Sequence, residues 1–193
     1  MARAGLNRGR VVAQAAVLAD DIGLERITLA SVAKHLGVRL PSLYNHVEGL
    51  EGLRRELSML ALRELAGQLG AAAVGKAGKD ALRATADAYR AYALRFPGRY
   101  AATVTAPAPA DDDHNEAAAA VLQVVVSVLH GYGLAGDPVI HAVRELRASM
   151  HGWADLEKRG AFGMPHDVDV SYQRLIDHLH VSLTQYADEP APQ

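Results

Sequence analysis

The sequence predicts an all-α protein, and three observations lead to that expectation. Alanine and leucine are abundant, whereas runs of β-branched residues are scarce. The one such run, residues 124–126, follows an alanine-rich stretch, so it favours a helix as well. Short clusters of glycine and proline divide the chain into segments of helical length.

Composition excludes several classes of protein. Of 193 residues, 50% are hydrophobic and 22% are charged, as in ordinary globular proteins. There is no cysteine, which excludes a disulfide scaffold, a thiolate metal site and a cysteine nucleophile. The longest uncharged stretch, residues 117–136, carries polar residues and three glycines, which indicates a buried helix and not a membrane span. The basic N-terminus lacks the apolar core of a signal peptide, so a cytoplasmic protein is expected.

Four helices are expected in the first part of the chain. Helical spacing of apolar residues predicts the first helix at residues 8–22, with Asn7 as its N-cap and Gly23 at its end. The second helix begins at Thr28 and ends at Gly37. A short third helix at residues 41–47, opened by Pro41, and a long fourth helix at residues 50–73 follow.

The remainder of the chain also reads as helices joined by loops. Glycines mark residues 74–79 as a linker, and proline or glycine marks loops at residues 106–113 and 160–167. Between these breaks we expect helices at residues 80–95, 99–105, 115–130, 138–159 and 169–187.

Residues 28–47 predict a helix-turn-helix motif. Two short helices meet at a turn that contains Gly37, where the chain needs a positive φ. An apolar cluster fixes the crossing and consists of Val32, Leu36, Val38, Leu43 and Val47. The polar, cationic and apolar side chains left outside suit phosphates, base edges and thymine methyl groups. The alternative is a tight helical corner with no role in DNA binding.

Net charge is compatible with DNA binding. The chain carries −2 in total, but residues 1–55 hold eight Lys and Arg against five Asp and Glu. A basic first quarter can lie on a polyanion. Chance accounts for an excess of this size equally well.

The motif closely resembles the DNA-binding domain of the TetR family of bacterial transcriptional regulators, and the resemblance covers residues 8–63. The phrase Leu36-Gly37-Val38-x-x-Pro41-Ser42-Leu43-Tyr44-x-His46-Val47 is similar to the tetracycline repressor branch in particular. The resemblance implies that the third helix lies in the major groove. The DNA-binding residues that it implies are Thr28, Arg39, Leu40, Pro41, Ser42, Tyr44, Asn45 and His46.

Three positions depart from the family pattern. Ala30 and Leu40 stand where polar readers are usual, so any base readout at Leu40 is expected to be apolar. Leu50 stands where the family usually has a lysine that anchors a phosphate. Without this lysine, we expect weaker binding or a backbone contact from Arg54 or Arg55, with Arg39 adding compensating charge.

The second half resembles C-terminal domains of the same family through Phe96-Pro97-Gly98-x-Tyr100 and His151-Gly152-Trp153. The resemblance implies a DNA-binding domain at residues 1–50, a linking helix at 50–73, and an effector-binding and dimerisation domain at 74–193. The alternative for His151-Gly152-Trp153 is packing, in which Gly152 lets two helices approach and Trp153 fills the gap. Effector candidates are Tyr89, Tyr92, Phe96, Leu129, His130, Met150, His151 and Trp153.

The resemblance implies that the last two helices form the dimer. Two apolar stripes would supply its surfaces, and one of the two must also cover the core of the monomer. The stripes are Val139, Ala142, Val143, Leu146 and Met150, and Ile176, Leu179, Leu183 and Tyr186.

No catalytic, metal-binding or cofactor-binding motif is present in the sequence. We therefore expect no enzyme and no cofactor. The resemblance implies instead a homodimeric regulator of transcription. It would act as a repressor that a small-molecule effector releases from a near-palindromic operator in double-stranded DNA. Two alternatives remain: a helical enzyme or metal-binding bundle, and a TetR-like DNA binder controlled by a protein partner.

Overall fold

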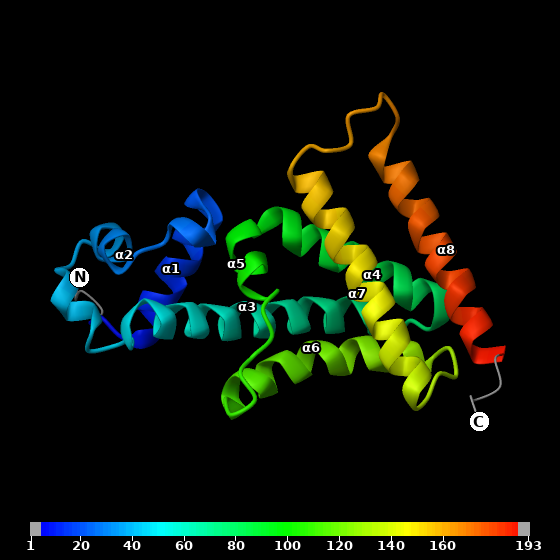
Figure 1. Ribbon diagram of the computed structural model, residues 1–193, viewed down its shortest axis with the longest axis horizontal. Coiled ribbons are helices and arrows are strands. Elements are labelled where there is room, and N and C mark those ends of the chain that lie inside the picture. The colour runs from blue at the N-terminus through cyan, green and yellow to red at the C-terminus, as the bar shows by residue number, and fades with distance from the viewer. Residues whose placement is uncertain (1–4, 189–193) are drawn as a thin grey trace. The chain divides into compact units, whose positions relative to one another are not determined.

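The computed structural model describes residues 5–188, and within that range the secondary structure is entirely helical (Figure 1). This confirms the predicted fold class. The α-helices in chain order are α1 (Arg8–Ile22), α2 (Leu29–Leu36), α3 (Gly49–Ala73), α4 (Gly78–Arg95), α5 (Pro97–Ala102), α6 (Asp112–His130), α7 (Asp137–Lys158) and α8 (Val168–Asp188). Two 3₁₀ helices join them, η1 (Leu24–Arg26) and η2 (Leu40–Leu43). Across residues 5–188, no helix is both long and apolar enough to cross a membrane.

The chain forms two compact units, which we describe separately. The first unit contains the chain up to Glu64 together with Arg95–Ala119, and the second contains Leu65–Leu94 and the chain from Ala120 onward. Residues 95–119 therefore pack with the first unit, although they lie in the interval expected for the second domain. The ends of both expected domains, residues 1–4 and 189–193, lie outside the described residues.

Local capping interactions fix the ends of α1 and α2. The Asn7 side chain accepts a hydrogen bond from the Arg10 backbone amide at 2.9 Å, which confirms the predicted N-cap of α1. At the start of α2, Thr28 and Ser31 each bond the other's backbone amide and form a capping box. Gly37 ends α2 in the left-handed region at φ 68°, as predicted.

The short helix predicted at residues 41–47 is present only in part and is not an α-helix. The chain instead forms the 3₁₀ helix η2, in which the Ser42 amide bonds the Arg39 carbonyl at 3.0 Å, and then a turn that ends when the Val47 amide bonds the Leu43 carbonyl. Pro41 is tolerated in the first turn of either kind of helix, and the i→i+3 bonds of a 3₁₀ helix are typical of so short a segment. Most other helix ends differ from expectation by one to three residues. Pro97, for example, follows the end of α4 and is itself the first residue of α5.

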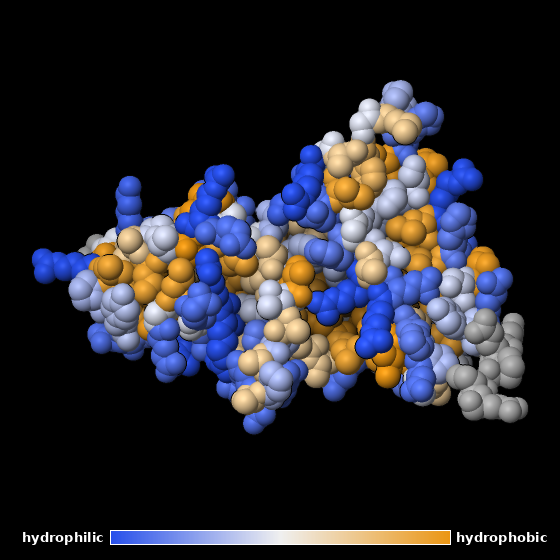
Figure 2. Space-filling view, in the orientation of Figure 1, coloured by the Kyte–Doolittle hydropathy of each residue, from blue (hydrophilic) through white to orange (hydrophobic). Residues whose placement is uncertain are grey.

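The second unit has a core built by α4, α6, α7 and α8. Most of both stripes expected at the dimer interface lie in this core, with Val139, Ala142, Leu146, Met150, Ile176, Leu179 and Leu183 buried. Val143 and Tyr186 are partly buried against the same core. Neither stripe is therefore free to face a partner. Hydrophobic side chains that do reach the surface of α7 and α8 include Ile140, Leu156, Val170 and Val181. Figure 2 shows hydrophobic residues scattered among hydrophilic ones on the face turned to the viewer.

Candidate functional site

The turn between α2 and η2 is held by the buried side chains that the sequence predicted. Val32 and Leu43 are fully buried and Val47 nearly so. The Val38 amide donates to the Ala33 carbonyl at 3.0 Å and thereby closes the turn at Gly37. The motif is therefore a rigid corner, whose outer surface is set by the residues between these anchors.

The segment from residue 39 to residue 46 presents the predicted DNA-binding side chains outward. Arg39, Leu40, Pro41, Tyr44 and Asn45 are exposed, with Tyr44 60% exposed. The other predicted residues are Ser42 and His46, which are half-buried, and Thr28, which is exposed at the start of α2. One short stretch thus gathers cationic, amide, hydroxyl and apolar groups, which are the types that contact phosphates and bases.

Arg8 holds the end of this segment in place, a role that no pattern in the sequence indicates. Its Nε atom donates to the His46 carbonyl at 3.3 Å, and its terminal nitrogen lies 3.4 Å from the Glu56 carboxylate. The backbone of His46 is therefore tied to α1 and α3. Arg8 and His46 lie 38 residues apart in the sequence, so no local sequence motif predicts their contact.

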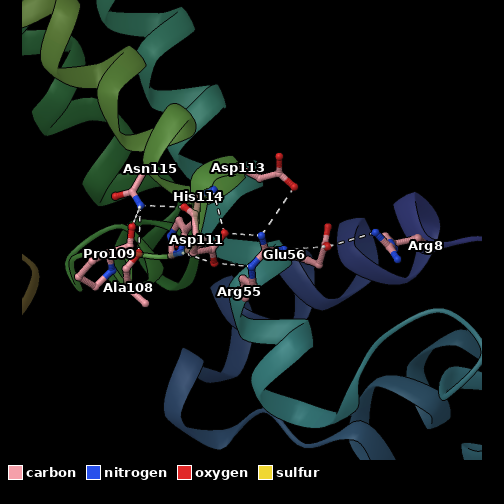
Figure 3. Close-up of polar contacts among 10 residues, drawn as sticks. Arg8, Arg55, Glu56, Ala108, Pro109, Asp111, Asp113, His114 and Asn115 are labelled. Atoms are coloured by element: carbon pink, nitrogen blue, oxygen red, sulfur yellow. Dashed lines mark hydrogen bonds and ion pairs between the residues drawn. The ribbon is translucent and has the colours of Figure 1, made fainter.

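The two arginines near the start of α3 differ in their engagement. Arg55 makes a two-pronged ion pair with Asp111, in the loop before α6, and also lies near Asp113 (Figure 3). This guanidinium holds the pKa of Asp111 down, at about 2. Arg54 instead pairs with the exposed Glu51 at 3.1 Å. Of the two candidates for a phosphate contact, Arg54 is the one whose partner can be exchanged at low cost.

Ser58, His114 and Asp111 lie together but do not form a nucleophilic triad. The Ser58 hydroxyl is buried and donates to the Ala102 carbonyl at 2.7 Å. It also lies 2.8 Å from His114 Nε2, and His114 Nδ1 is 3.8 Å from Asp111. Burial lowers the pKa of His114. Since the hydroxyl proton is directed at a carbonyl, this group joins α3, α5 and α6 and does not activate Ser58.

The motif around Gly98 joins α5 to α1. A Cβ atom on Gly98 would lie 2.1 Å from the carbonyl carbon of Ala19, so only glycine permits this approach. The Asp20 carboxylate accepts hydrogen bonds from the amides of Gly98 and Arg99, at 3.0 and 2.9 Å. Arg99 Nε lies 3.0 Å from the same carboxylate. Burial raises the pKa of Asp20, and these contacts oppose the rise.

The effector candidates divide between the two units. Tyr92, Leu129 and Met150 are buried in the second unit, and Tyr89, His151 and Trp153 are half-buried there. Two candidates do not join them. Phe96 lies in the first unit with its ring under the Arg99 guanidinium at 4.5 Å, and His130 is exposed. A role in effector binding stays a prediction for all eight residues.

Gly152 and Trp153 behave differently from the packing interpretation. A Cβ atom on Gly152 would meet nothing within 4 Å, so this glycine does not serve a close helix approach within the chain. Trp153 does pack, with its ring centroid 4.7 Å from that of Phe162 and 5.4 Å from that of Tyr172. Only the second half of that interpretation therefore holds.

A polar network beside Trp153 was not apparent from the sequence. Arg90 on α4 pairs with Glu157 on α7 and with Asp169 on α8, and it lies 4.6 Å over the ring of Tyr172. Trp153 Nε1 donates to Glu157 at 3.1 Å. Burial raises the pKa of Tyr172. Three helices of the second unit are thus joined around one guanidinium.

No group of three or more His, Asp or Glu side chains that could hold a metal ion occurs within residues 5–188.

Comparisons with known proteins agree with these features. Residues 82–179 match the family model described as "Tetracyclin repressor-like, C-terminal domain". An uncharacterized HTH-type transcriptional regulator of Mycobacterium tuberculosis is 36% identical over 158 residues, which is 81% of this chain and 72% of that one. One of Bacillus subtilis is 33% identical over 168 residues, 86% of each chain. The crystal structure of a single-residue variant of TetR from Acinetobacter baumannii, in complex with minocycline, has a TM-score of 0.71 at 20% identity, covering 94% of this chain and 98% of that chain.

Proposed function

The chain belongs to the TetR family of transcriptional regulators, and on this premise we propose that it is a homodimeric repressor that binds a near-palindromic operator and leaves it when a small effector binds. It is a DNA-binding regulator of helix-turn-helix type. The proposal consists of four parts: that the regulator represses, that it is a dimer, that it binds an effector, and that it is cytoplasmic. The proposal includes no catalytic residue and no cofactor.

The observation that carries the proposal is the outward segment of residues 39–46 on a rigid corner. Buried Leu43 and Val47 fix the backbone, and Arg39, Tyr44 and Asn45 extend from it. In helix-turn-helix proteins the corresponding element enters the major groove. We assign base contacts to Leu40, Pro41 and Asn45, and contacts near the backbone to Thr28, Ser42, Tyr44 and His46, with Arg39 supplying charge and Arg54 a phosphate contact.

A mobility-shift titration tests DNA binding. The full chain is first used to select duplexes from a random pool, and the enriched duplex is then titrated with the wild type and with Arg39→Ala. We expect saturable binding that weakens as salt rises, because released counterions drive phosphate contacts. Arg39→Ala should bind more weakly and with a smaller salt slope. Binding that does not saturate with any duplex would contradict the proposal.

The dimer is proposed to form through the outer faces of α7 and α8. Ile140 and Leu156 on α7 and Val170 and Val181 on α8 are about half exposed, and Gly152 leaves space on α7. Two helices from each protomer would bury these faces in a four-helix bundle. Ile140→Asp should give monomers in sedimentation, whereas Val74→Asp, at an exposed position outside these helices, should leave the dimer intact. A dimeric Ile140→Asp variant would count against this face.

The effector is proposed to bind in the second unit among Tyr89, Tyr92, Leu129, Met150, His151 and Trp153. Phe96, in the first unit, and the exposed His130 stay further candidates. The minocycline complex of the Acinetobacter protein supports a small organic effector. An effector needs a coupling free energy of only ~1–3 kcal/mol to change operator affinity some 5- to 150-fold. Screening compounds for release of the selected duplex tests this part. A DNA binder that no compound releases would instead favour control by a protein partner.

A further inference from the structure

The outward segment of the helix-turn-helix carries exposed apolar side chains that the fold does not need. Leu40 is 37% exposed and Tyr44 is 60% exposed, and the exposed Pro41 lies between them. Leu40 does not belong to the hydrophobic core of the first unit or to the residues packed against it, whereas Leu36, Val38 and Leu43 do. A polar side chain at position 40 would therefore cost the fold little.

The position of Leu40 is closely fixed by its backbone. The Val38 amide bonds the Ala33 carbonyl on one side, and the Ser42 amide bonds the Arg39 carbonyl on the other. Pro41 restricts the backbone further because its ring sets φ. Leu40 is thus an apolar side chain on a well-fixed backbone at the start of η2. Ala30, a smaller apolar residue, is exposed on α2.

Of the groups that bases present in the major groove, the C5-methyl of thymine is the one methyl group and the largest apolar one. Leucine has no hydrogen-bonding group, so against the other base edges it would leave donors or acceptors without partners. We propose that Leu40 selects thymine, by contact with its C5-methyl group, at one position of each operator half-site. The hydrogen-bonded part of recognition then falls to Arg39 and Asn45. This inference rests on the proposed function, since it applies only where residues 39–46 lie in the major groove.

Replacing thymine by deoxyuridine removes the methyl group and leaves every hydrogen-bonding group of the base in place. We would take the duplex that the full chain selects, replace its thymines by deoxyuridine one symmetric pair at a time, and measure dissociation constants by fluorescence anisotropy. At one symmetric pair of thymines, the replacement should weaken binding of the wild type by about fourfold for each of the two half-sites. This factor corresponds to the burial of one methyl group. In Leu40→Ala the ratio between the deoxyuridine and thymine duplexes at that pair should fall to near one.

Val17→Ala is the matched control, because Val17 is an exposed apolar residue of the same unit and lies on α1. This variant should keep the wild-type ratio at every position. A 5-methylcytosine–guanine pair at the sensitive position should bind more tightly than cytosine–guanine with the wild type, and equally with Leu40→Ala. If Leu40→Ala keeps the full wild-type ratio, or if no thymine methyl affects the wild type, the inference is wrong although the DNA-binding function stands. If the chain selects no duplex at all, the proposed function fails first.

Discussion

Replacing Gly98 by alanine tests the joint between α5 and α1 most severely. The added Cβ atom would lie 2.1 Å from both the carbonyl carbon and oxygen of Ala19 and 2.5 Å from the Asp20 amide nitrogen. Non-bonded carbon atoms prefer separations of about 3.5–4.0 Å. Because the atoms it meets are helix backbone, no side-chain rotation relieves the clash, and α5 must move away from α1 by on the order of 1 Å.

The movement has a calculable cost. The amides of Gly98 and Arg99 lie 3.0 and 2.9 Å from Asp20 Oδ1, so a shift of this size takes both beyond hydrogen-bonding distance. Bonds to a charged group contribute about 1.5–3 kcal/mol each. Loss of both gives an expected decrease in the free energy of unfolding of about 3–6 kcal/mol, a large share of the ~5–15 kcal/mol of a typical domain.

Urea denaturation followed by circular dichroism measures this decrease. Gly67→Ala is the control, since Gly67 lies within α3 and a Cβ atom there would meet nothing within 4 Å. That variant should be more stable by up to about 1 kcal/mol from helix propensity. If Gly98→Ala does not fold, Asp20→Ala tests the same joint without a clash. It removes the acceptor of both amide bonds and should lower the free energy of unfolding by a similar amount. Wild-type stability of both variants would refute the joint.

Three further predictions concern the DNA-binding unit. Tyr44→Ala should weaken operator binding by about 1–3 kcal/mol in a mobility-shift titration while the melting temperature stays unchanged, because the side chain is exposed; unaltered affinity would remove Tyr44 from the interface. Gly37→Val should destabilise the fold by about 1–3 kcal/mol through φ alone, since its Cβ would meet nothing within 4 Å, and Gly37→Asn should cost less; equal losses would show that the positive φ is not the cause. Arg55 holds the pKa of Asp111 at about 2, below its ordinary value, so this pair stabilises the fold above about pH 4 and the contribution is lost as the pH falls towards 2; denaturation midpoints of Arg55→Gln should therefore fall less steeply than those of the wild type over this range, and parallel curves would contradict the assignment.

Local signals in the sequence were sufficient for the ends of helices. Asn7, Thr28 and Gly37 act on backbone groups within four residues of themselves, so the cap and the turn could be predicted from residue type alone. The helix predicted at residues 41–47 is shorter than expected because the pattern of buried Leu43 and Val47 fits both an α-helix and a 3₁₀ helix followed by one α-type bond. Pro41 was expected to begin this helix, and the structure places it in the first turn of η2, which begins at Leu40.

Contacts between distant residues could not be predicted in this way. Arg8 with His46, Asp20 with Gly98 and Arg55 with Asp111 each join residues at least 38 positions apart, and charged residues carry no mark of their partner. The stripes on the last two helices were correctly identified as apolar. Their spacing could not show whether a stripe faces the same chain or a partner, because the core of a monomer and the interface of a homodimer contain the same types of apolar residue.

Footprinting of the selected operator tests the central claim most directly. In a hydroxyl-radical experiment with the full chain, we expect two protected half-sites on one face of the duplex, with centres about 34–36 Å apart, one helical turn, as two helix-turn-helix units of a dimer require. Tyr44→Ala should reduce both protections together at equal protein concentration. A single protected segment, or protection that is unaltered in this variant, would contradict a dimer that reads DNA through residues 39–46.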